Sequence, residues 1–426
     1  MTYEEALQFI HSPLHFGSKP GLLRIRALME ACGNPQKKVK FVHVAGTNGK
    51  GSTTTMLSNI LQAAGYRTGL FISPYVDDFR ERMQVNGEMI PRAALCEEVE
   101  RLLPAIEAIR EQGHTHPTEF EIVTALALNW FARAGCDIVA LEVGLSGSQD
   151  CTNVIDAPEA AVLTPISLDH TKQLGSTISA IAGVKCGIIK PGSDIVTCYD
   201  QDPAALEVIR RTCAEKGTPL HIPDKSGVDL LRSDITGSTV DYGGTELTVP
   251  MAGAHQIQNM LTAYTAAKVL QQRGWNISDE DIRRGIASTR FPGRLEIIRR
   301  QPLVLLDGGH NMACADAVAR ALDEHLSGRR IITVMGMCMD KDTAYCVPKI
   351  ARRSSVFIAA QSDVPRAMPA RELARLAVGH CKEVHWNENT YTAARIALEL
   401  AKPGDVILVC GSLYILHEAR EALTQA

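Results

Sequence analysis

The segment Phe41–Thr54, FVHVAGTNGKGSTT, carries side chains that could bind the phosphates of a nucleotide. Phosphates are bound by backbone N–H groups that converge at a helix N-terminus, and glycines allow that close approach. Lys50 could reach the terminal phosphates, and Ser52 could offer a hydroxyl to Mg²⁺ or to a phosphate. The usual phosphate-loop pattern is not matched, because Gly51 separates the lysine from the serine and Val44 stands where the pattern has glycine. The alternative is a tight glycine-rich turn.

The elements expected around this segment favour the nucleotide site. Residues 40–46 form a β-rich apolar run, residues 53–65 repeat apolar side chains at helical spacing, and residues 67–73 form another apolar run. The glycines therefore lie between a predicted strand and a predicted helix, which is the context that a phosphate loop requires.

Three more polar side chains lie close to predicted strand ends or helices of the first half. Glu142 closes the apolar run 137–144, and a carboxylate there could hold Mg²⁺, although an exposed acid is the simpler interpretation. His170 follows the run 160–166, and a hydrogen-bonded structural histidine is the alternative to a ligand. Lys185 lies on a predicted helix, where an exposed lysine with its stem on an apolar face is the alternative.

The second half holds polar clusters at the ends of its predicted elements. They are GAHQIQN with Asn259, FPGRLE with Arg294, and LLDGGHN with Asp307. The guanidinium of Arg294 suits phosphate oxygens. Asp307 closes a predicted strand, so it is the member of these clusters that we most expect to contact a ligand. Each cluster alone could be a helix cap or a turn.

The length of 426 residues and the order of the elements predict two α/β domains. Helices alternate with strands in the first half, which predicts a mostly parallel sheet, and residues 237–253 interrupt this order with a short antiparallel insertion. A second alternating series starts near Pro302, so we place the boundary within residues 291–302.

Composition excludes several classes of protein. The net charge of −4 gives no basic face for nucleic acid, and no apolar run is long enough to cross a bilayer. The twelve cysteines form no CxxC pair, so we expect reduced core residues in a cytoplasmic protein. A dinucleotide-dependent oxidoreductase is disfavoured because no GxGxxG follows a strand with an acid about twenty residues on. No heptad argues for assembly, so a monomer is expected.

Taken together, eight segments resemble the folylpolyglutamate synthase/dihydrofolate synthase family, within the wider Mur ligase group. They occur in the family's order: the opening YEEALQFIHS…FGSKPGLLRIRALMEACGNPQ, HVAGTNGKGS, FISPYVDDFRERMQVNG, LTPISLDHTKQLGSTISAIAGVKCGIIKPG, GAHQIQN, FPGRLE, LDGGHN and GSLY. The extra Gly51 is the family's own form of the loop. The resemblance implies a P-loop Mur-ligase-type ATPase domain over residues 1–297 and a smaller Rossmann-like glutamate-ligase domain over residues 298–426, with ATP bound between them.

The resemblance also implies the reaction. ATP would phosphorylate a carboxylate of tetrahydrofolate or dihydropteroate, and the amine of L-glutamate would attack the acyl phosphate, leaving an amide, ADP and phosphate. This is an ATP-dependent acid–amino-acid ligase that uses ATP and one or two Mg²⁺ ions. Its partners would be a folate or pteroate and L-glutamate, with no nucleic acid and no membrane.

Site residues follow from the resemblance position by position. ATP would be bound by Gly49, Lys50, Gly51, Ser52, Asn259, Arg294 and Asp307. Mg²⁺ would be held by Ser73, Glu142 and His170, and Lys185 matches a lysine that the family carries as a carbamate. Lys50, Lys185 and His170 would be catalytic, and Asp150, His310 and Ser412 would line the substrate cleft.

The chain departs from the family at the loop expected near the acyl substrate. The family commonly reads EVGLGGRLDATN, whereas this chain reads EVGLSGSQDCTN with Ser146, Ser148 and Gln149; Tyr75 also replaces a usual histidine. The ATP side is intact, so these changes bear on the substrate. Two alternatives therefore stay open: a divergent paralogue that ligates an amino acid to another carboxylate, and a nucleotide-binding protein without ligase activity. Whether a folate ligase would be monofunctional or bifunctional is also left open.

Overall fold

The computed structural model describes residues 1–12 and 21–424, so part of the opening segment of the resemblance, residues 13–20, lies outside the described residues. The chain forms two compact units. Unit 1 comprises Met1–Ser226 and Gln258–Thr289, and unit 2 comprises Gly227–Ile257 and Arg290–Ala426. Unit 2 thus includes the segment Gly227–Ile257, which the sequence-based division assigned to the first domain. The division at residue 297 stays a prediction.

Unit 1 is built on an eight-stranded sheet in the order β4-β3-β2-β5-β1-β6-β7-β8. Pairing is parallel from β2 to β8, and among the described strands of this sheet the antiparallel pairings are β2–β3 and β3–β4, which confirms the mostly parallel sheet. The central strands are buried along almost their whole length, which explains their continuous apolar sequences. The strands are β1 (Lys40–Ala45), β2 (Thr68–Phe71), β3 (Met83–Val85), β4 (Glu88–Met89), β5 (Ile138–Glu142), β6 (Ala160–Leu163), β7 (Asp194–Thr197) and β8 (Leu220–His221).

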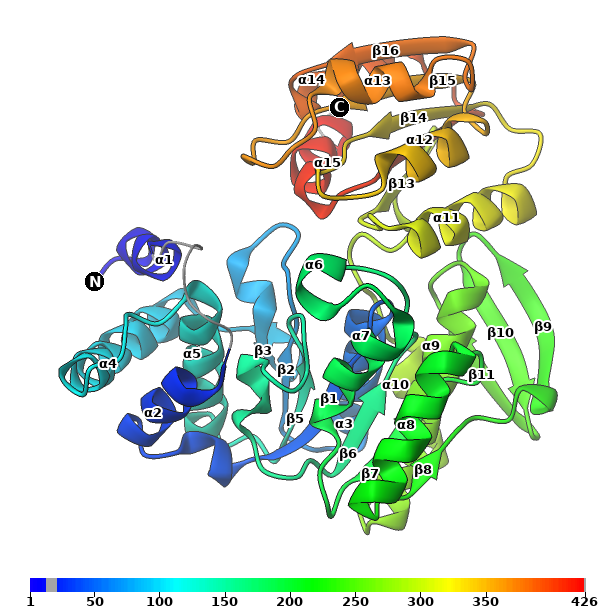
Figure 1. Cartoon of the computed structure of the whole chain (residues 1–426). Helices are drawn as coiled ribbons and strands as arrows, with labels where there is room; N and C mark the ends of the chain where they lie inside the picture. The colour runs from blue at the N-terminus through cyan, green and yellow to red at the C-terminus, as the bar shows by residue number, and fades with distance from the viewer. Residues whose placement is uncertain (13–20, 425–426) are drawn as a thin grey trace. The chain divides into compact units, whose positions relative to one another are not determined.

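Helices pack against this sheet in two groups (Figure 1). One core cluster joins the sheet to α1 (Tyr3–His11), α2 (Leu23–Ala31), α4 (Arg92–Glu111) and α5 (Glu119–Arg133). Another joins β6 and β7 to α7 (Ile178–Lys185) and α8 (Pro203–Lys216). The remaining helices are α3 (Lys50–Ala63), α6 (Thr171–Leu174), α9 (Ala254–Gln272), which begins in unit 2 and continues in unit 1, and α10 (Asp279–Ala287).

Helices α3 and α10 cross closely at Gly285. A Cβ atom at this position would lie 2.5 Å from the backbone nitrogen of Ile60 and 2.8 Å from the carbonyl carbon of Asn59. Backbone cannot move aside as a flexible side chain can. We therefore expect Gly285→Ala to lower the free energy of unfolding by about 1–3 kcal/mol in urea titrations, through overpacking.

The matched control for this prediction is Gly183→Ala in α7. No atom lies within 4 Å of a Cβ atom built at Gly183, so the substitution meets open space. The higher helix propensity of alanine should leave this variant as stable as the parent, or more stable by up to about 1 kcal/mol. Equal stabilities of the two variants would contradict the close crossing.

Unit 2 contains two sheets. The antiparallel one confirms the predicted insertion and runs β11-β10-β9, with β9 (Val228–Asp234), β10 (Gly237–Tyr242) and β11 (Thr245–Val249). The six-stranded sheet has the order β12-β13-β17-β14-β15-β16 and is parallel from β13 to β16. Its strands are β12 (Glu296–Arg300), β13 (Leu303–Asp307), β14 (Ile331–Met335), β15 (Val356–Ala360), β16 (Glu383–Asn387) and β17 (Val406–Cys410). Its helices are α11 (Met312–His325), α12 (Thr343–Ala351), α13 (Ala370–Ala377), α14 (Thr390–Leu400) and α15 (Leu416–Thr424).

The segment expected to be only a domain boundary contains an edge strand. β12 pairs antiparallel with β13, and the connection between them is only Gln301–Pro302. Antiparallel neighbours can be joined by a short turn, so no helix separates β12 from β13. The search for strands that alternate with helices therefore did not identify β12.

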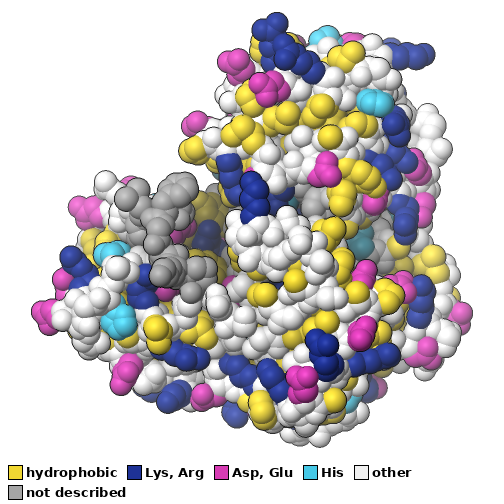
Figure 2. All heavy atoms as spheres, viewed as in Figure 1, with side chains coloured by type: hydrophobic (Ala, Val, Ile, Leu, Met, Phe, Trp, Pro, Cys, Tyr) yellow, Lys and Arg dark blue, Asp and Glu magenta, His cyan; other side chains and the backbone are white. Residues whose placement is uncertain are grey.

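The surface and the cysteines agree with the composition. Figure 2 shows acidic and basic side chains interspersed over the visible face, without a wide area of one sign. All twelve cysteines are free of disulfides, and eight of them are buried. Within the described part of the chain, no helix combines the length and the apolar character that a membrane span needs.

Candidate active site

The glycine-rich loop of unit 1 leads from β1 directly into the first turn of α3. Gly49 adopts a left-handed backbone with φ of 83°, and Lys50 is the first residue of the helix. Its N-cap residue, Gly49, has no side chain with which to cap the helix. The first N–H groups of any helix lack intrahelical acceptors and lie at the positive end of its dipole, so this end suits an anion.

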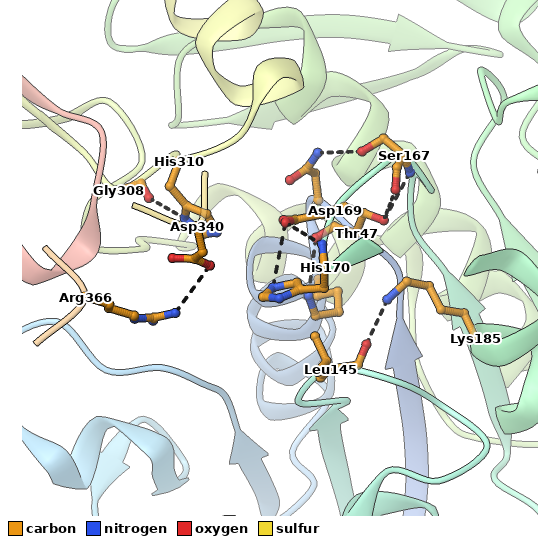
Figure 3. A network of polar contacts seen from close by, with 12 residues as sticks. Thr47, Leu145, Ser167, Asp169, His170, Lys185, Gly308, His310, Asp340 and Arg366 are labelled. Carbon is orange, nitrogen blue, oxygen red and sulfur yellow. Dashed lines mark hydrogen bonds and ion pairs between the residues drawn. The ribbon is translucent and has the colours of Figure 1, made fainter. Parts of the chain in front are cut away.

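The loop after β6 holds the glycine-rich loop in place. The backbone N–H groups of Thr47 and Asn48 donate to the carbonyl of Pro165 at 2.9 and 3.2 Å. The hydroxyl of Thr47 donates to the Ser167 carbonyl at 3.1 Å and accepts from the Ser167 N–H at 3.0 Å, as Figure 3 shows. These partners were missed at the sequence level, although the polar residues after the strand 160–163 could have indicated them.

Two glycines of the loop are required by their surroundings. A Cβ atom at Gly46 would overlap the hydroxyl of Thr164, and one at Gly49 would overlap the side-chain oxygen of Asn259. The helix α9 therefore places Asn259 directly against the start of α3, and its contact with nucleotide stays a prediction.

We expect Gly49→Ala to destabilise unit 1 through two effects. The left-handed φ of 83° is strained for alanine, and the new methyl group would overlap Asn259. Gly65→Ala is the matched control, because Gly65 has φ of 90° but no atom within 4 Å of its Cβ position. In urea titrations the free energy of unfolding should fall by about 1–3 kcal/mol more in Gly49→Ala than in Gly65→Ala. Equal decreases in the two variants would contradict the overlap with Asn259.

Lys50 and Ser52 both lie in the first turn of α3. The Lys50 ammonium donates to the carbonyl of Thr47 at 3.3 Å, so its side chain folds back over the loop that it follows. Ser52 is buried. The cation and the hydroxyl predicted to contact phosphates therefore both lie in the first turn of the helix, whose N–H groups have no intrahelical acceptors.

Glu142 and Ser73 come together at the carboxyl ends of two adjacent strands. β2 and β5 are parallel neighbours, and the Ser73 N–H donates to Glu142 Oε2 at 3.0 Å. Glu142 is only 4% exposed, so the interpretation as an exposed acid is wrong. Both were predicted to be magnesium ligands, and that role stays a prediction.

His170 precedes α6 in a left-handed conformation with φ of 49°. This conformation is uncommon for a residue other than glycine, and such strain is concentrated at functional sites. The His170 N–H donates to Asp169 Oδ1 at 2.8 Å, and His170 Nε2 lies 3.9 Å from the same oxygen (Figure 3). The histidine ring is about one third exposed, so it remains accessible to a ligand.

Lys185 is the last residue of α7 and is only 2% exposed, so the interpretation as an exposed lysine is wrong. Its Nζ donates to the carbonyl of Leu145 at 3.0 Å (Figure 3). Burial, assisted by the positive charge of Lys50, lowers the pKa of Lys185 to about 7, against the opposing effect of Asp150 and Asp169. At neutral pH a large share of this amine is uncharged.

Asp150 organises the loop in which the chain departs from the family. Its carboxylate accepts hydrogen bonds from the backbone N–H groups of Gly144, Leu145, Ser146 and Thr152 at 2.9–3.3 Å. Asp150 was predicted to line the substrate cleft. The structure gives its carboxylate a role within its own loop, and contact with substrate stays a prediction.

In unit 2, Arg294 and Asp307 lie at the same end of the antiparallel pair β12–β13, Arg294 before β12 and Asp307 at the end of β13. Asp307 ends β13 and accepts from the N–H groups of Leu295 at 3.0 Å and Gly309 at 2.8 Å. Burial raises the pKa of Asp307, and the positive charge of Arg294 opposes that rise. The Arg294 guanidinium stacks over Phe291, with 5.4 Å between its central carbon and the ring centroid.

His310 and Ser412 occupy the carboxyl ends of neighbouring strands, β13 and β17. His310 Nδ1 contacts the carbonyl of Gly308 at 3.1 Å (Figure 3), and the Ser412 hydroxyl accepts from the Tyr414 N–H at 3.2 Å. Both were predicted to line the cleft, and that role stays a prediction.

The predicted magnesium ligands can be tested against the chemistry of the ion. Mg²⁺ prefers oxygen donors and retains several waters, with one or two carboxylates completing the shell beside substrate phosphates. Glu142 and the hydroxyl of Ser73 fit this pattern, and His170 is the less typical donor. Among the described residues no group of three or more His, Cys, Asp or Glu side chains forms a closed metal site. Glu142 and Ser73 thus supply the oxygen donors that Mg²⁺ prefers, and magnesium binding stays a prediction.

Comparison with known proteins covers both units. The Mur ligase middle domain matches residues 44–267, and the glutamate ligase domain of Mur ligases matches residues 293–413. A curated dihydrofolate synthase/folylpolyglutamate synthase of Bacillus subtilis is 35% identical over 430 residues, covering 99% of each chain.

Solved structures agree with this relationship. The Mycobacterium tuberculosis folylpolyglutamate synthase complexed with ADP and AMPPCP is 29% identical, with a TM-score of 0.89 over 100% of this chain and 98% of that one. The Escherichia coli relative in complex with DHPP and ADP is 28% identical, with a TM-score of 0.85 over 99% and 97%. With the glycine loop, the strand-end residues and the full-length similarity in agreement, the chain belongs to the folylpolyglutamate synthase/dihydrofolate synthase family of Mur ligases.

Proposed function

We propose that this chain is an ATP-dependent ligase that joins L-glutamate to a carboxylate of tetrahydrofolate through an acyl phosphate. The observation that carries the proposal is the glycine N-cap of α3, with Lys50 and Ser52 in the first turn of the helix and the buried amine of Lys185 held nearby in the same unit. Phosphoryl transfer depends chiefly on positioning and charge neutralisation, which this arrangement supplies. The solved complexes of relatives with ADP and AMPPCP support ATP as the nucleotide.

The proposed roles divide by residue. Lys50, Gly49, Gly51 and Ser52 would bind the phosphates, with Asn259, Arg294 and Asp307 as further nucleotide contacts. Ser73, Glu142 and His170 would hold magnesium, which would neutralise charge on the transferred phosphoryl group. Asp150, His310 and Ser412 would line the path of the folate or the glutamate. Lys185 would act as a carbamate.

A second candidate activity is the ligation of glutamate to dihydropteroate. Two relatives favour it: the Bacillus subtilis protein named for both activities and the Escherichia coli protein solved with DHPP. A third candidate is a different carboxylate substrate, and the reason is the loop with Ser146, Ser148 and Gln149.

One substrate panel separates these candidates. Purified protein is given ATP, Mg²⁺ and L-glutamate with tetrahydrofolate, its one-carbon derivatives, dihydropteroate or no acceptor, and products are identified by mass. The proposal expects product and phosphate release with tetrahydrofolate. Product with dihydropteroate as well would establish the bifunctional enzyme. Nucleotide binding without product from any pterin would reject folate ligation and favour the different carboxylate.

The carbamate on Lys185 has its own test. Carbon dioxide reacts only with an uncharged amine, and an amine with a pKa of about 7 becomes mostly uncharged as the pH rises through 7, whereas an ordinary lysine stays protonated. With ¹³C-bicarbonate, a carbamate carbon signal should appear and should grow between about pH 6 and pH 8. Lys185→Met should lack it and the exposed Lys172→Met should keep it. An unlabelled Lys185 in the wild type would contradict the modification.

We also propose a monomer in the cytoplasm. The twelve cysteines, none of which forms a disulfide, support a reducing compartment. Light scattering at several concentrations tests the monomer, and a mass that doubles with concentration would contradict it.

A further inference from the structure

A buried histidine in the central strand of unit 1 has no part in the roles proposed above. His43 lies in β1 among apolar neighbours and is completely buried. Its Nε2 lies 2.9 Å from the hydroxyl oxygen of Thr152, whereas its Nδ1 is buried without a hydrogen-bond partner among the described residues. An orphaned buried nitrogen is unfavourable, so an aliphatic residue would be the more stable choice unless the ring has a task.

The hydrogen bonds around Thr152 determine which nitrogen of His43 carries the proton. The Thr152 hydroxyl lies 2.7 Å from Asp150 Oδ1, and a carboxylate can only accept. A hydroxyl has one hydrogen, so Thr152 donates it to Asp150 and must accept from His43. His43 is therefore the Nε2–H tautomer. Burial, together with the positive charge of Lys190, lowers the pKa of His43 to about 3, so the ring stays neutral.

From Asp150 the hydrogen bonds continue to Lys185. Asp150 Oδ2 accepts the Leu145 N–H at 2.9 Å, and the carbonyl of the same Leu145 accepts from Lys185 Nζ at 3.0 Å. The loop also packs on α7 itself, because the Ser148 N–H donates to the Val184 carbonyl at 2.9 Å. The carbonyl that orients the Lys185 amine is thus held by a carboxylate whose position depends on Thr152 and His43.

We propose that His43 is a positioning residue: through Thr152 and Asp150 it fixes the loop 144–146, whose Leu145 carbonyl orients the amine of Lys185. The catalytic consequence rests on the proposed function, whereas the structural consequence does not. The competing interpretation is a histidine that merely fills the core, in which case its loss would weaken the whole of unit 1 and not one loop.

Paired variants separate the two interpretations. His43→Met fills the space without a donor, whereas His43→Gln keeps a side-chain N–H at a similar distance from the backbone. Thr152→Val removes the hydroxyl, whereas Thr152→Ser keeps it. Ser58→Ala is the control, because Ser58 is equally buried in unit 1 but its hydroxyl accepts from Gln62 and not from the loop.

Amide hydrogen exchange is the first measurement. In His43→Met and Thr152→Val, the amides of Gly144, Leu145 and Ser146 should exchange about tenfold faster relative to the amides of α8, as the loss of a hydrogen bond allows. The glutamine, serine and Ser58→Ala variants should keep the wild-type ratio. Equal acceleration over loop and α8, or no acceleration, would overturn the proposal.

Two further measurements complete the test. The ¹⁵N shifts of His43 in the wild type should show the Nε2–H tautomer, and an Nδ1–H tautomer would overturn the assignment. Turnover should fall about tenfold in His43→Met and Thr152→Val with KM for ATP unchanged, and should recover in His43→Gln and Thr152→Ser. A matching rise in KM for ATP would instead favour general distortion of the unit and overturn the positioning role.

The readouts also distinguish failure of this inference from failure of the proposed function. A wild-type protein without ligase activity would reject the proposed function, while exchange and tautomer would still decide the role of His43. An active enzyme whose loop exchange is unaffected by Thr152→Val would overturn the positioning role alone. If His43→Met does not fold, the Thr152 pair gives the same answer.

Discussion

We expect Lys50→Met to lower ATP-dependent turnover by on the order of 10³-fold, since it removes a positioned charge from a site where charge on phosphoryl oxygens must be stabilised. Methionine keeps the length and most of the apolar stem of lysine, so the start of α3 should retain its conformation. The wild-type hydrogen bond from Lys50 to the Thr47 carbonyl is a long one at 3.3 Å, so little stability depends on it. Phosphate release in the presence of tetrahydrofolate and glutamate measures the effect.

The control for this prediction is Lys172→Met, which removes an exposed lysine from α6 in the same unit. Its turnover should stay within about twofold of the wild type, since an exposed charge contributes little. Urea titration checks that Lys50→Met is folded. A folded Lys50→Met variant that keeps more than about a tenth of the activity would contradict the phosphate role of Lys50.

Lys185→Met is expected to abolish turnover and, unusually for a buried residue, to stabilise the protein. Burial holds the native pKa at about 7, whereas the unfolded lysine has its ordinary value of 10.5. Below pH 10.5 folding must therefore release a proton from the lysine or bury its charge, and either process opposes folding. Methionine has no proton to release, so the free energy of unfolding of the variant should be higher by on the order of a few kcal/mol at pH 7. The loss of the hydrogen bond to the Leu145 carbonyl reduces this gain.

The pH dependence of this gain gives its signature. Between pH 7 and pH 10.5 the unfolded chain binds more protons than the native one, so wild-type stability rises with pH over this window. The advantage of Lys185→Met should therefore be largest below pH 7 and should fade towards pH 10.5. Urea titrations in buffer freed of carbon dioxide measure it, with Lys172→Met expected to show no such trend. If the difference in the free energy of unfolding between Lys185→Met and the wild type did not change with pH, the lowered pKa of the buried Lys185 would be contradicted.

Both variants concern unit 1, where the local pattern of the sequence was most informative. The run before Gly46 and the helical spacing after Lys50 predict β1 and α3, and both elements are present. Glu142 closes an apolar run of the sequence, so we predicted that it lies at the carboxyl end of a parallel strand, where ligand sites gather. In the structure Glu142 is the last residue of β5. Such signals are local: a period of two or 3.6 residues, or a glycine at a tight turn, is visible within about ten neighbours.

Other features could not be read from the pattern. The sequence of β12 is too short for an alternation of apolar and polar residues to be recognised. What identifies it as a strand is its pairing with β13, which the sequence alone does not show. The segment Gly227–Ile257 was seen as an insertion, but its grouping with unit 2 depends on contacts distant in sequence.

By itself the sequence predicted the alternation of strands and helices, the glycine-rich loop between β1 and α3 and, through its resemblance to a family, the expected chemistry. Only the tertiary structure decided that Lys185 is buried with its pKa lowered to about 7, that Asp150 binds its own loop, and that His43 reaches that loop through Thr152. The physical reason is that burial and hydrogen bonding are properties of neighbours in space. His43 and Thr152 are 109 positions apart in the chain. Their hydrogen bond forms because β5 is the neighbour of β1 in the sheet, so the segment that follows β5 comes close to His43.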